Sequence, residues 1–101
     1  MKRAYLAGPM TGYPDLNFPL FHRTAAHFRA QGIDVVNPAE INADPAAGWI
    51  DCMRNDIREL VTCDSILMLP GWEKSKGASL EHYIARQLEL RVVYLTSEVP
   101  A

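Results

Sequence analysis

The sequence predicts a single α/β domain over residues 1–101, with three layers, α/β/α, and an open parallel sheet of the flavodoxin/Rossmann-like type. Three observations predict it. Short apolar runs alternate with segments of helical periodicity, in the order strand, helix, strand, helix, strand, helix, strand. Glycine and proline separate these segments. The length of 101 residues suits one hydrophobic core. We expect four to five strands with helices on both faces.

The first half of the chain contains two strands and one helix. Residues 3–7 form an apolar run that ends in a loop rich in glycine and proline. A helix follows, with Asn17 as its expected N-cap and Gly32 as its stop. Residues 33–36 are rich in β-branched side chains and form the second strand, which ends before Pro38 because the residue preceding a proline leaves helical geometry.

The second half contains two helices and two strands. The polar segment up to Gly48 is expected to be a loop that is long enough to cover a site. The helix after it has the apolar positions Trp49, Ile50, Met53, Ile57, Leu60 and Val61. Residues 65–69 form a strand that is buried on both faces. A last helix begins near Gly77, with Leu80, Ile84, Ala85 and Leu88 as its apolar stripe, and the final strand covers residues 91–95.

Composition excludes several functional classes. The 10 basic and 12 acidic residues give a net charge of -2, and the longest basic run is Lys2-Arg3, so we expect no nucleic-acid partner. No apolar stretch approaches the roughly 20 residues that cross a bilayer, so we expect no membrane partner and a cytoplasmic protein. Cys52 and Cys63 lack zinc-type spacing and are expected to be reduced; we expect no metal and no cofactor.

Two acids and a tyrosine do not fit a purely structural role. Glu81 falls between Leu88 and Ala85 on the apolar stripe of its helix, where an ionised carboxylate needs partners or a cleft. A first-turn glutamate favoured by the helix dipole is the alternative. Asp56 lies at the edge of a stripe and is either solvated or paired with Glu81. Tyr5 is either a core residue or a hydroxyl that reaches a buried carboxylate.

The loops after Ala7, Val36 and Leu69 should share one rim of the sheet, where ligands of such folds bind. Residues 73–77 lead into the last helix, whose free amides suit a phosphate, although a solvated loop is the alternative. Trp72 either stacks on a base or packs over the loop. The Walker A, dinucleotide-binding and Gly-x-Ser-x-Gly patterns are absent.

Taken together, four segments carry a resemblance to a known family: residues 4–12 (AYLAGPMTG), 37–40 (NPAE), 54–57 (RNDI) and 69–81 (LPGWEKSKGASLE). The chain resembles the nucleoside 2-deoxyribosyltransferase superfamily, and more closely its short bacterial and phage members, whose activity is largely inferred. The resemblance spans almost the whole chain and agrees with the predicted fold.

The resemblance implies roles for individual residues. Glu81 matches the nucleophile that attacks the anomeric carbon, Asp56 the aspartate that helps to protonate the leaving base, and Tyr5 the tyrosine that orients the nucleophile. Ser75 falls where transferases carry an acid that meets the sugar and where deoxynucleotide hydrolases carry a phosphate-binding serine. The residues expected to contact the substrate are Gly8, Pro9, Met10, Asn37, Trp72, Ser75, Lys76 and Gly77.

The expected activity is hydrolysis of the N-glycosidic bond, or deoxyribosyl transfer, on 2'-deoxynucleosides or their 5'-monophosphates. Water as acceptor gives hydrolysis and a second base gives transfer. Glu81 must ionise to attack, so its pKa should lie near about 4.3, unless burial requires protection by Tyr5. The alternatives are a non-catalytic nucleotide-binding or regulatory module and cleavage of a nicotinamide nucleotide.

The resemblance also implies a homo-oligomer, a dimer or higher. Active relatives complete the pocket with residues beyond the last strand, partly from a neighbouring subunit, and this sequence departs from that pattern because it ends at Ala101. Phe18, Trp49 and the outer helix faces are the surfaces that we expect a second copy to cover.

Overall fold

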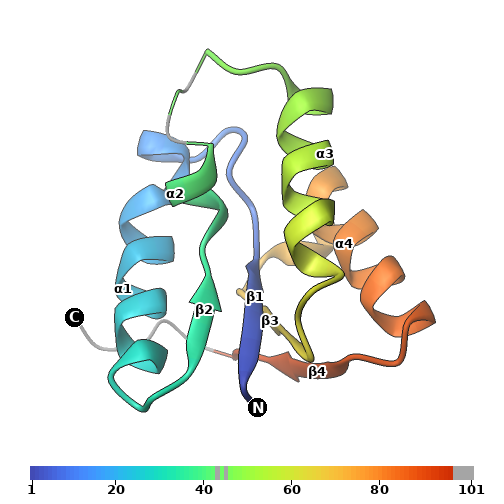
Figure 1. The fold of residues 1–101 in the computed structure, drawn as a ribbon. Helices are drawn as coiled ribbons and strands as arrows, with labels where there is room; N and C mark the ends of the chain where they lie inside the picture. Colours follow the sequence, from blue (N-terminus) through green and yellow to red (C-terminus); the bar gives the residue numbers. More distant parts are fainter. Residues whose placement is uncertain (43, 45, 97–101) are drawn as a thin grey trace.

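The computed structural model describes residues 1–42, 44 and 46–96 and confirms the predicted α/β class. In this part of the chain the sheet has four strands, all parallel, in the order β2-β1-β3-β4. The strands are β1 (Arg3–Ala7), β2 (Asp34–Val36), β3 (Ser65–Met68) and β4 (Arg91–Tyr94). Helix α1 lies on one side of the sheet, and helices α3 and α4 lie on the other (Figure 1).

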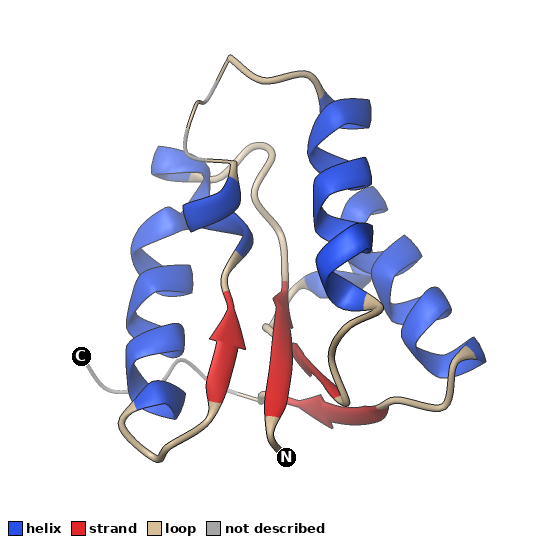
Figure 2. Cartoon of the chain, viewed as in Figure 1, coloured by secondary structure: helices blue, strands red, loops and turns tan. Residues whose placement is uncertain are grey.

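The three long helices are α1 (Phe18–Arg29), α3 (Trp49–Leu60) and α4 (Lys76–Gln87). Short elements lie in the connections: the 3-10 helices η1 (Pro14–Asn17) and η2 (Trp72–Lys74), and the single-turn helix α2 (Pro38–Ile41), all of which Figure 2 colours as helix. The sequence predicted a loop where α2 lies. The turn forms there because the Asn37 side chain accepts a 3.0 Å hydrogen bond from the Ala39 amide and a proline occupies the first helical position.

Alternation along β1 separates two core clusters. Ala4 and Leu6 are buried in the cluster that includes Phe21 of α1. Tyr5 and Ala7 are buried in the opposite cluster, which includes Leu60 of α3 and both Ala78 and Ala85 of α4. The side chain of Tyr5 therefore faces the layer formed by α3 and α4.

The strand order reverses between β1 and β3, which makes the carboxyl ends of these two strands the usual ligand-binding position in this class of fold. The loops that follow the two strands pack tightly on one another. A Cβ at Gly8 would lie 2.7 Å from the Cβ of Leu69, and a Cβ at Gly71, where φ is +89°, would lie 2.9 Å from the Tyr13 hydroxyl. Only glycine permits these approaches, so the two loops form one rim.

Several predicted details are wrong. Leu80 and Leu88 are 38% and 53% exposed, and the buried face of α4 is formed instead by Ala78, Glu81 and Ala85. Helix α4 begins one residue earlier than predicted because Ser75 caps it. Asn17 occupies the N-cap position of α1 with a left-handed backbone, and its side chain donates to the Pro9 carbonyl at 2.9 Å instead of capping the helix.

The observed strands β2, β3 and β4 are each one residue shorter than the predicted runs. Cys52 and Cys63 both carry free thiols. None of the helices in the described ranges has the length and apolar character needed to cross a membrane.

Candidate active site

Tyr5 and Glu81 form the centre of the site. The Tyr5 hydroxyl donates a hydrogen bond to Oε2 of Glu81, and both residues are buried, with Glu81 only 4% exposed. The contact depends on the residues around Tyr5 in β1 and around Glu81 in α4. Tyr5 points toward α4 by strand alternation, and the small side chains of Ala78 and Ala85 on the same face of α4 let the helix approach the sheet. The alternative of a first-turn glutamate favoured by the helix dipole is wrong, because α4 begins at Lys76 and has no acidic residue in its first turn.

Asp56 of α3 completes an acid pair. It is 7% exposed, which excludes the solvated alternative, and its Oδ1 accepts a 2.5 Å hydrogen bond from the Asn42 side-chain amide. Tyr5 also hydrogen-bonds to Asp56, so a single phenol links the two acids. Burial raises the pKa of Asp56 to about 6, and the hydrogen bonds from Asn42 and Tyr5 oppose that rise.

Burial also raises the pKa of Glu81, to about 8. Hydrogen-bond donation by Tyr5 lowers this pKa, and the negative charge of Asp56 raises it further. The expectation of a value near the ordinary one for glutamate is wrong because the carboxyl is almost fully desolvated. At neutral pH the two raised pKa values indicate that the pair holds one proton, which the two interacting acids share.

The start of α4 holds three of the predicted substrate contacts. The Ser75 Oγ accepts a 3.1 Å hydrogen bond from the Ala78 amide, which caps the helix and leaves the hydroxyl hydrogen free to donate elsewhere. The Lys76 ammonium lies 4.2 Å from the centroid of the Trp49 ring. Gly77 packs against α3, since a Cβ there would lie 3.1 Å from the Met53 sulfur.

The other predicted contacts at the rim have structural partners. Gly8 packs on Leu69, the Pro9 carbonyl accepts from Asn17, and Met10 packs against the core cluster on the α1 side. Asn37 is 1% exposed, and its side chain caps α2 and contacts Nδ1 of His22 at 3.2 Å. Substrate contact by these four residues stays a prediction, and the burial of Asn37 argues against it for that side chain.

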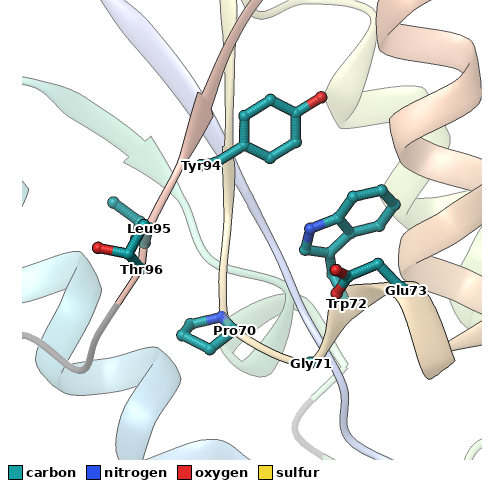
Figure 3. A pocket seen from close by; sticks show the side chains of 7 residues that line it. All are labelled: Pro70, Gly71, Trp72, Glu73, Tyr94, Leu95 and Thr96. Atoms are coloured by element: carbon teal, nitrogen blue, oxygen red, sulfur yellow. The ribbon is translucent and has the colours of Figure 1, made fainter.

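Trp72 packs against the core cluster that contains Tyr5. It lines an open hollow of about 550 Å³ at the carboxyl ends of β3 and β4 (Figure 3). The lining residues are Pro70, Gly71, Trp72, Glu73, Tyr94, Leu95 and Thr96. The Trp72 ring packs on the His82 ring with 4.2 Å between centroids, and Nε2 of His82 lies 2.8 Å from the Tyr94 hydroxyl. Contact of Trp72 with a substrate stays a prediction.

Sequence reasoning missed Asn42. It lies in the polar segment that was expected to be a loop, where no periodicity distinguishes one asparagine from another. Its contact with Asp56 joins residues 14 apart and depends on how α2 meets α3. Among the described residues, no group of three or more His, Cys, Asp or Glu side chains is placed to hold a metal ion.

Chemically, the linked acids can combine two tasks: one carboxyl can supply a proton while the other, once ionised, can attack or stabilise an electron-poor carbon. The structure superposes on a 2-desoxiribosyltransferase from Leishmania mexicana with a TM-score of 0.73 and 21% sequence identity, over 94% of this chain and 64% of that one. This likeness shows the fold. The chain spans 64% of the length of that structure, slightly less than two thirds.

No curated protein is significantly similar to the chain in sequence. A family model does match it, over residues 2–94, a range that contains all four strands and all the residues of the acid pair and its partners. The chain therefore belongs to the family described as Domain of unknown function (DUF4406).

Proposed function

We propose that the protein acts on the N-glycosidic bond of 2'-deoxynucleosides or their 5'-monophosphates, as a hydrolase or a deoxyribosyltransferase. The observation that carries this proposal is the hydrogen-bonded group in which Tyr5 joins the buried acids Asp56 and Glu81. A 2-desoxiribosyltransferase with the same fold supports the class of reaction, at an identity that is evidence of fold alone.

In the proposed reaction, the Glu81 carboxylate attacks the anomeric carbon. The bond from that carbon to the base nitrogen breaks, its electron pair stays on the base, and Asp56 donates a proton to the departing base. Water or a nitrogen of a second base then attacks the anomeric carbon, and the bond from that carbon to the Glu81 oxygen breaks with its electron pair on Glu81. The Asp56 carboxylate takes the proton that the incoming water or base loses. The first acceptor gives hydrolysis and the second gives transfer.

This reaction requires Glu81 to be ionised and Asp56 to be protonated, so the shared proton must lie on Asp56 when the substrate is attacked. Tyr5 offers a route between the two states. Its oxygen can accept the proton of Glu81 while its own proton passes to Asp56, which leaves the phenol neutral. An ionised and a protonated carboxyl can both accept the hydrogen bond from Tyr5, so the contact is compatible with either proton distribution.

A 5'-phosphate fits the start of α4. The free hydroxyl hydrogen of Ser75, the positive end of the helix dipole and the Lys76 side chain all favour an anion there. In this proposal Ser75 contacts the phosphate while its oxygen keeps the cap on Ala78. The preferred substrate is therefore the 5'-monophosphate over the free nucleoside.

The test is incubation with a set of 2'-deoxynucleosides and 2'-deoxynucleoside 5'-monophosphates, with free base followed by chromatography. Wild type should release base, and Glu81→Gln and Asp56→Asn should lose most of that release. Glu89→Gln is a matched control, since Glu89 is exposed at the far end of α4. Absence of release by wild type, or equal release by wild type and Glu81→Gln, would overturn the proposal.

A second function has one observation in its favour. Glu81 is nearly enclosed and, in the free protein at neutral pH, mainly protonated, which suits a site that binds a nucleotide without attacking it. Such a module would bind deoxynucleotides in calorimetry and give no product in the base-release assay. A nicotinamide nucleotide, cleaved at the same type of bond, belongs in the same screen.

A homo-oligomer is part of the proposal. Trp49, Ile50 and Tyr83 are exposed on α3 and α4, on the side of the sheet that carries the acid pair. Phe18 does not belong to this surface because it packs against the core cluster on the α1 side. Light scattering coupled to size-exclusion chromatography should give a mass of at least twice the 11.3 kDa of the chain, and a monomer would contradict this part.

A further inference from the structure

Asn42 is bound on three sides. Its backbone amide donates to the Pro38 carbonyl at 2.9 Å, which ends α2. Its side-chain Nδ2 donates to Oδ1 of Asp56 at 2.5 Å. Its side-chain Oδ1 is 3.4 Å from Nδ2 of Asn55, which donates to it from α3. The amide is thus held at both ends and has one orientation that satisfies both neighbours.

The surroundings of Asp56 give this contact its importance. The titratable groups that face Asp56 are Tyr5 from β1, Glu81 from α4 and Cys52 from α3 itself. Among these described neighbours none carries a positive charge. The negative charge of Asp56 is therefore stabilised by hydrogen-bond donors, and Asn42 is the donor that never ionises.

Tyr5 has only one hydrogen for two acids, whereas the Asn42 amide donates to Asp56 alone. Donation to Oδ1 favours the ionised form of Asp56 and fixes the plane of its carboxyl group. It also leaves the other carboxyl oxygen to exchange a proton. Asn42 therefore acts on the one-proton state of the pair through Asp56, at a distance from the bond that is broken.

We propose that Asn42 is a positioning residue, which orients Asp56 through its Oδ1 and biases the proton shared by the two acids toward Glu81. The proposal rests on the proposed function for its catalytic meaning, since the bias defines the resting state from which Tyr5 transfers a proton. The structural part of the proposal needs no substrate. It can therefore be tested separately.

The test is a carbon-13 NMR titration of the Asp56 carboxyl in the free protein, for wild type and for Asn42→Leu. Leucine has the same number of side-chain heavy atoms and the same branching, and it removes both polar groups. The pKa of Asp56 should rise by about one pH unit when the donor is lost, because a hydrogen bond to a charged group has about that effect. Asn42→Asp, which keeps the shape and replaces the donor with a negative oxygen, should raise it further and serves if the leucine variant does not fold.

Two further variants separate positioning from general disturbance. Asn55→Leu leaves the amide of Asn42 in place without its support, and should shift the Asp56 titration in the same direction by a smaller amount. Gln87→Leu makes the same type of change at an exposed position at the end of α4 and should leave the titration as in wild type.

An unchanged Asp56 titration in folded Asn42→Leu and Asn42→Asp would overturn the inference. If the titration shifts as expected and wild type releases no base from any nucleotide, the proposed function fails while the positioning role stands. If wild type releases base, the pH profile of that release should shift in Asn42→Leu, which a loss of stability alone would not produce.

Discussion

The Tyr5 hydroxyl on β1 donates a hydrogen bond to the Glu81 carboxyl on α4, across 76 positions of sequence. The same phenol hydrogen-bonds to Asp56 on α3. One strand residue therefore connects two helices and two acids inside a nearly dry environment. The proton that the acids share, the stability of the fold and the proposed chemistry all depend on this one side chain.

Tyr5→Phe tests the connection. Removal of the hydroxyl takes away the donor that lowers the pKa of Glu81, so that pKa should rise further. The rate of base release should fall on the order of 100-fold, which is the lower end of the rate contribution of a side chain that transfers a proton. The measurements are a carboxyl titration by NMR and the base-release assay. Tyr83→Phe, on the exposed side of α4, is the control, and equal effects from both variants would contradict the assigned role.

Glu81→Gln should stabilise the protein at high pH. The pKa of Glu81 in the folded state, about 8, lies above the ordinary glutamate value of 4.5, so the folded state binds the proton more tightly. Stability is therefore complete below about pH 4.5 and is lost as the pH rises through 8. Glutamine cannot ionise and avoids this loss, which amounts to a few kcal/mol at about 1.4 kcal/mol per pKa unit.

Urea unfolding at about pH 5 and about pH 9 measures the difference in the free energy of unfolding between Glu81→Gln and wild type. Asp56→Asn should show a smaller gain that begins at lower pH, because the pKa of Asp56 is raised only to about 6. If the difference between Glu81→Gln and wild type is the same at both pH values, Glu81 does not have a raised pKa.

Ser75 variants separate the cap from the proposed phosphate contact. Ser75→Ala removes the acceptor for the Ala78 amide and should cost about 1 kcal/mol of stability. Ser75→Asp keeps a capping oxygen and adds a negative charge, so it should retain stability. Both should lose the preference for a deoxynucleoside 5'-monophosphate over the nucleoside in calorimetry. A preference that survives in folded Ser75→Asp would place the phosphate elsewhere.

Gly8→Ala should destabilise the fold by about 2 kcal/mol, the usual cost of an added methyl group in a packed region. The new Cβ would lie 2.7 Å from the Cβ of Leu69, an atom close to the backbone that cannot move aside freely. Gly77→Ala is the comparison, since its Cβ would meet the flexible Met53 side chain and alanine favours a helix. Thermal unfolding measures both, and equal stability of the two variants would contradict the tight packing at Gly8.

The element order and the central site residues could be predicted from sequence. Alternation in residues 3–7 places Tyr5 opposite Ala4 and Leu6, and helical spacing places Glu81 on the same side of α4 as Ala85. These are local periodicities. What they did not reveal was which of the apolar residues of α4 are buried: Leu80 and Leu88 are exposed, because the helix faces the sheet through its small residues.

Other parts of the site depend on contacts that no local pattern records. Trp72 was expected to stack on a base or to pack over its loop, and it packs on His82 and lines a hollow with Tyr94, a residue of the edge strand. Asn42 was not singled out and binds Asp56. Asn37 was expected to bind substrate and is buried as the cap of α2. In each case the residue in contact belongs to another helix or strand, so a local sequence pattern does not reveal the contact.

By itself the sequence determined that this chain forms a parallel α/β sheet with helices on both faces, and that Tyr5, Asp56 and Glu81 occupy unusual positions on their elements. Only the tertiary structure decided that Tyr5 meets Glu81, that both acids are buried on the same side of the sheet, and that Asn42 hydrogen-bonds to Asp56. The physical reason is that periodicity is set by the geometry of one strand or helix, whereas desolvation and hydrogen bonding between acids depend on how several elements pack together.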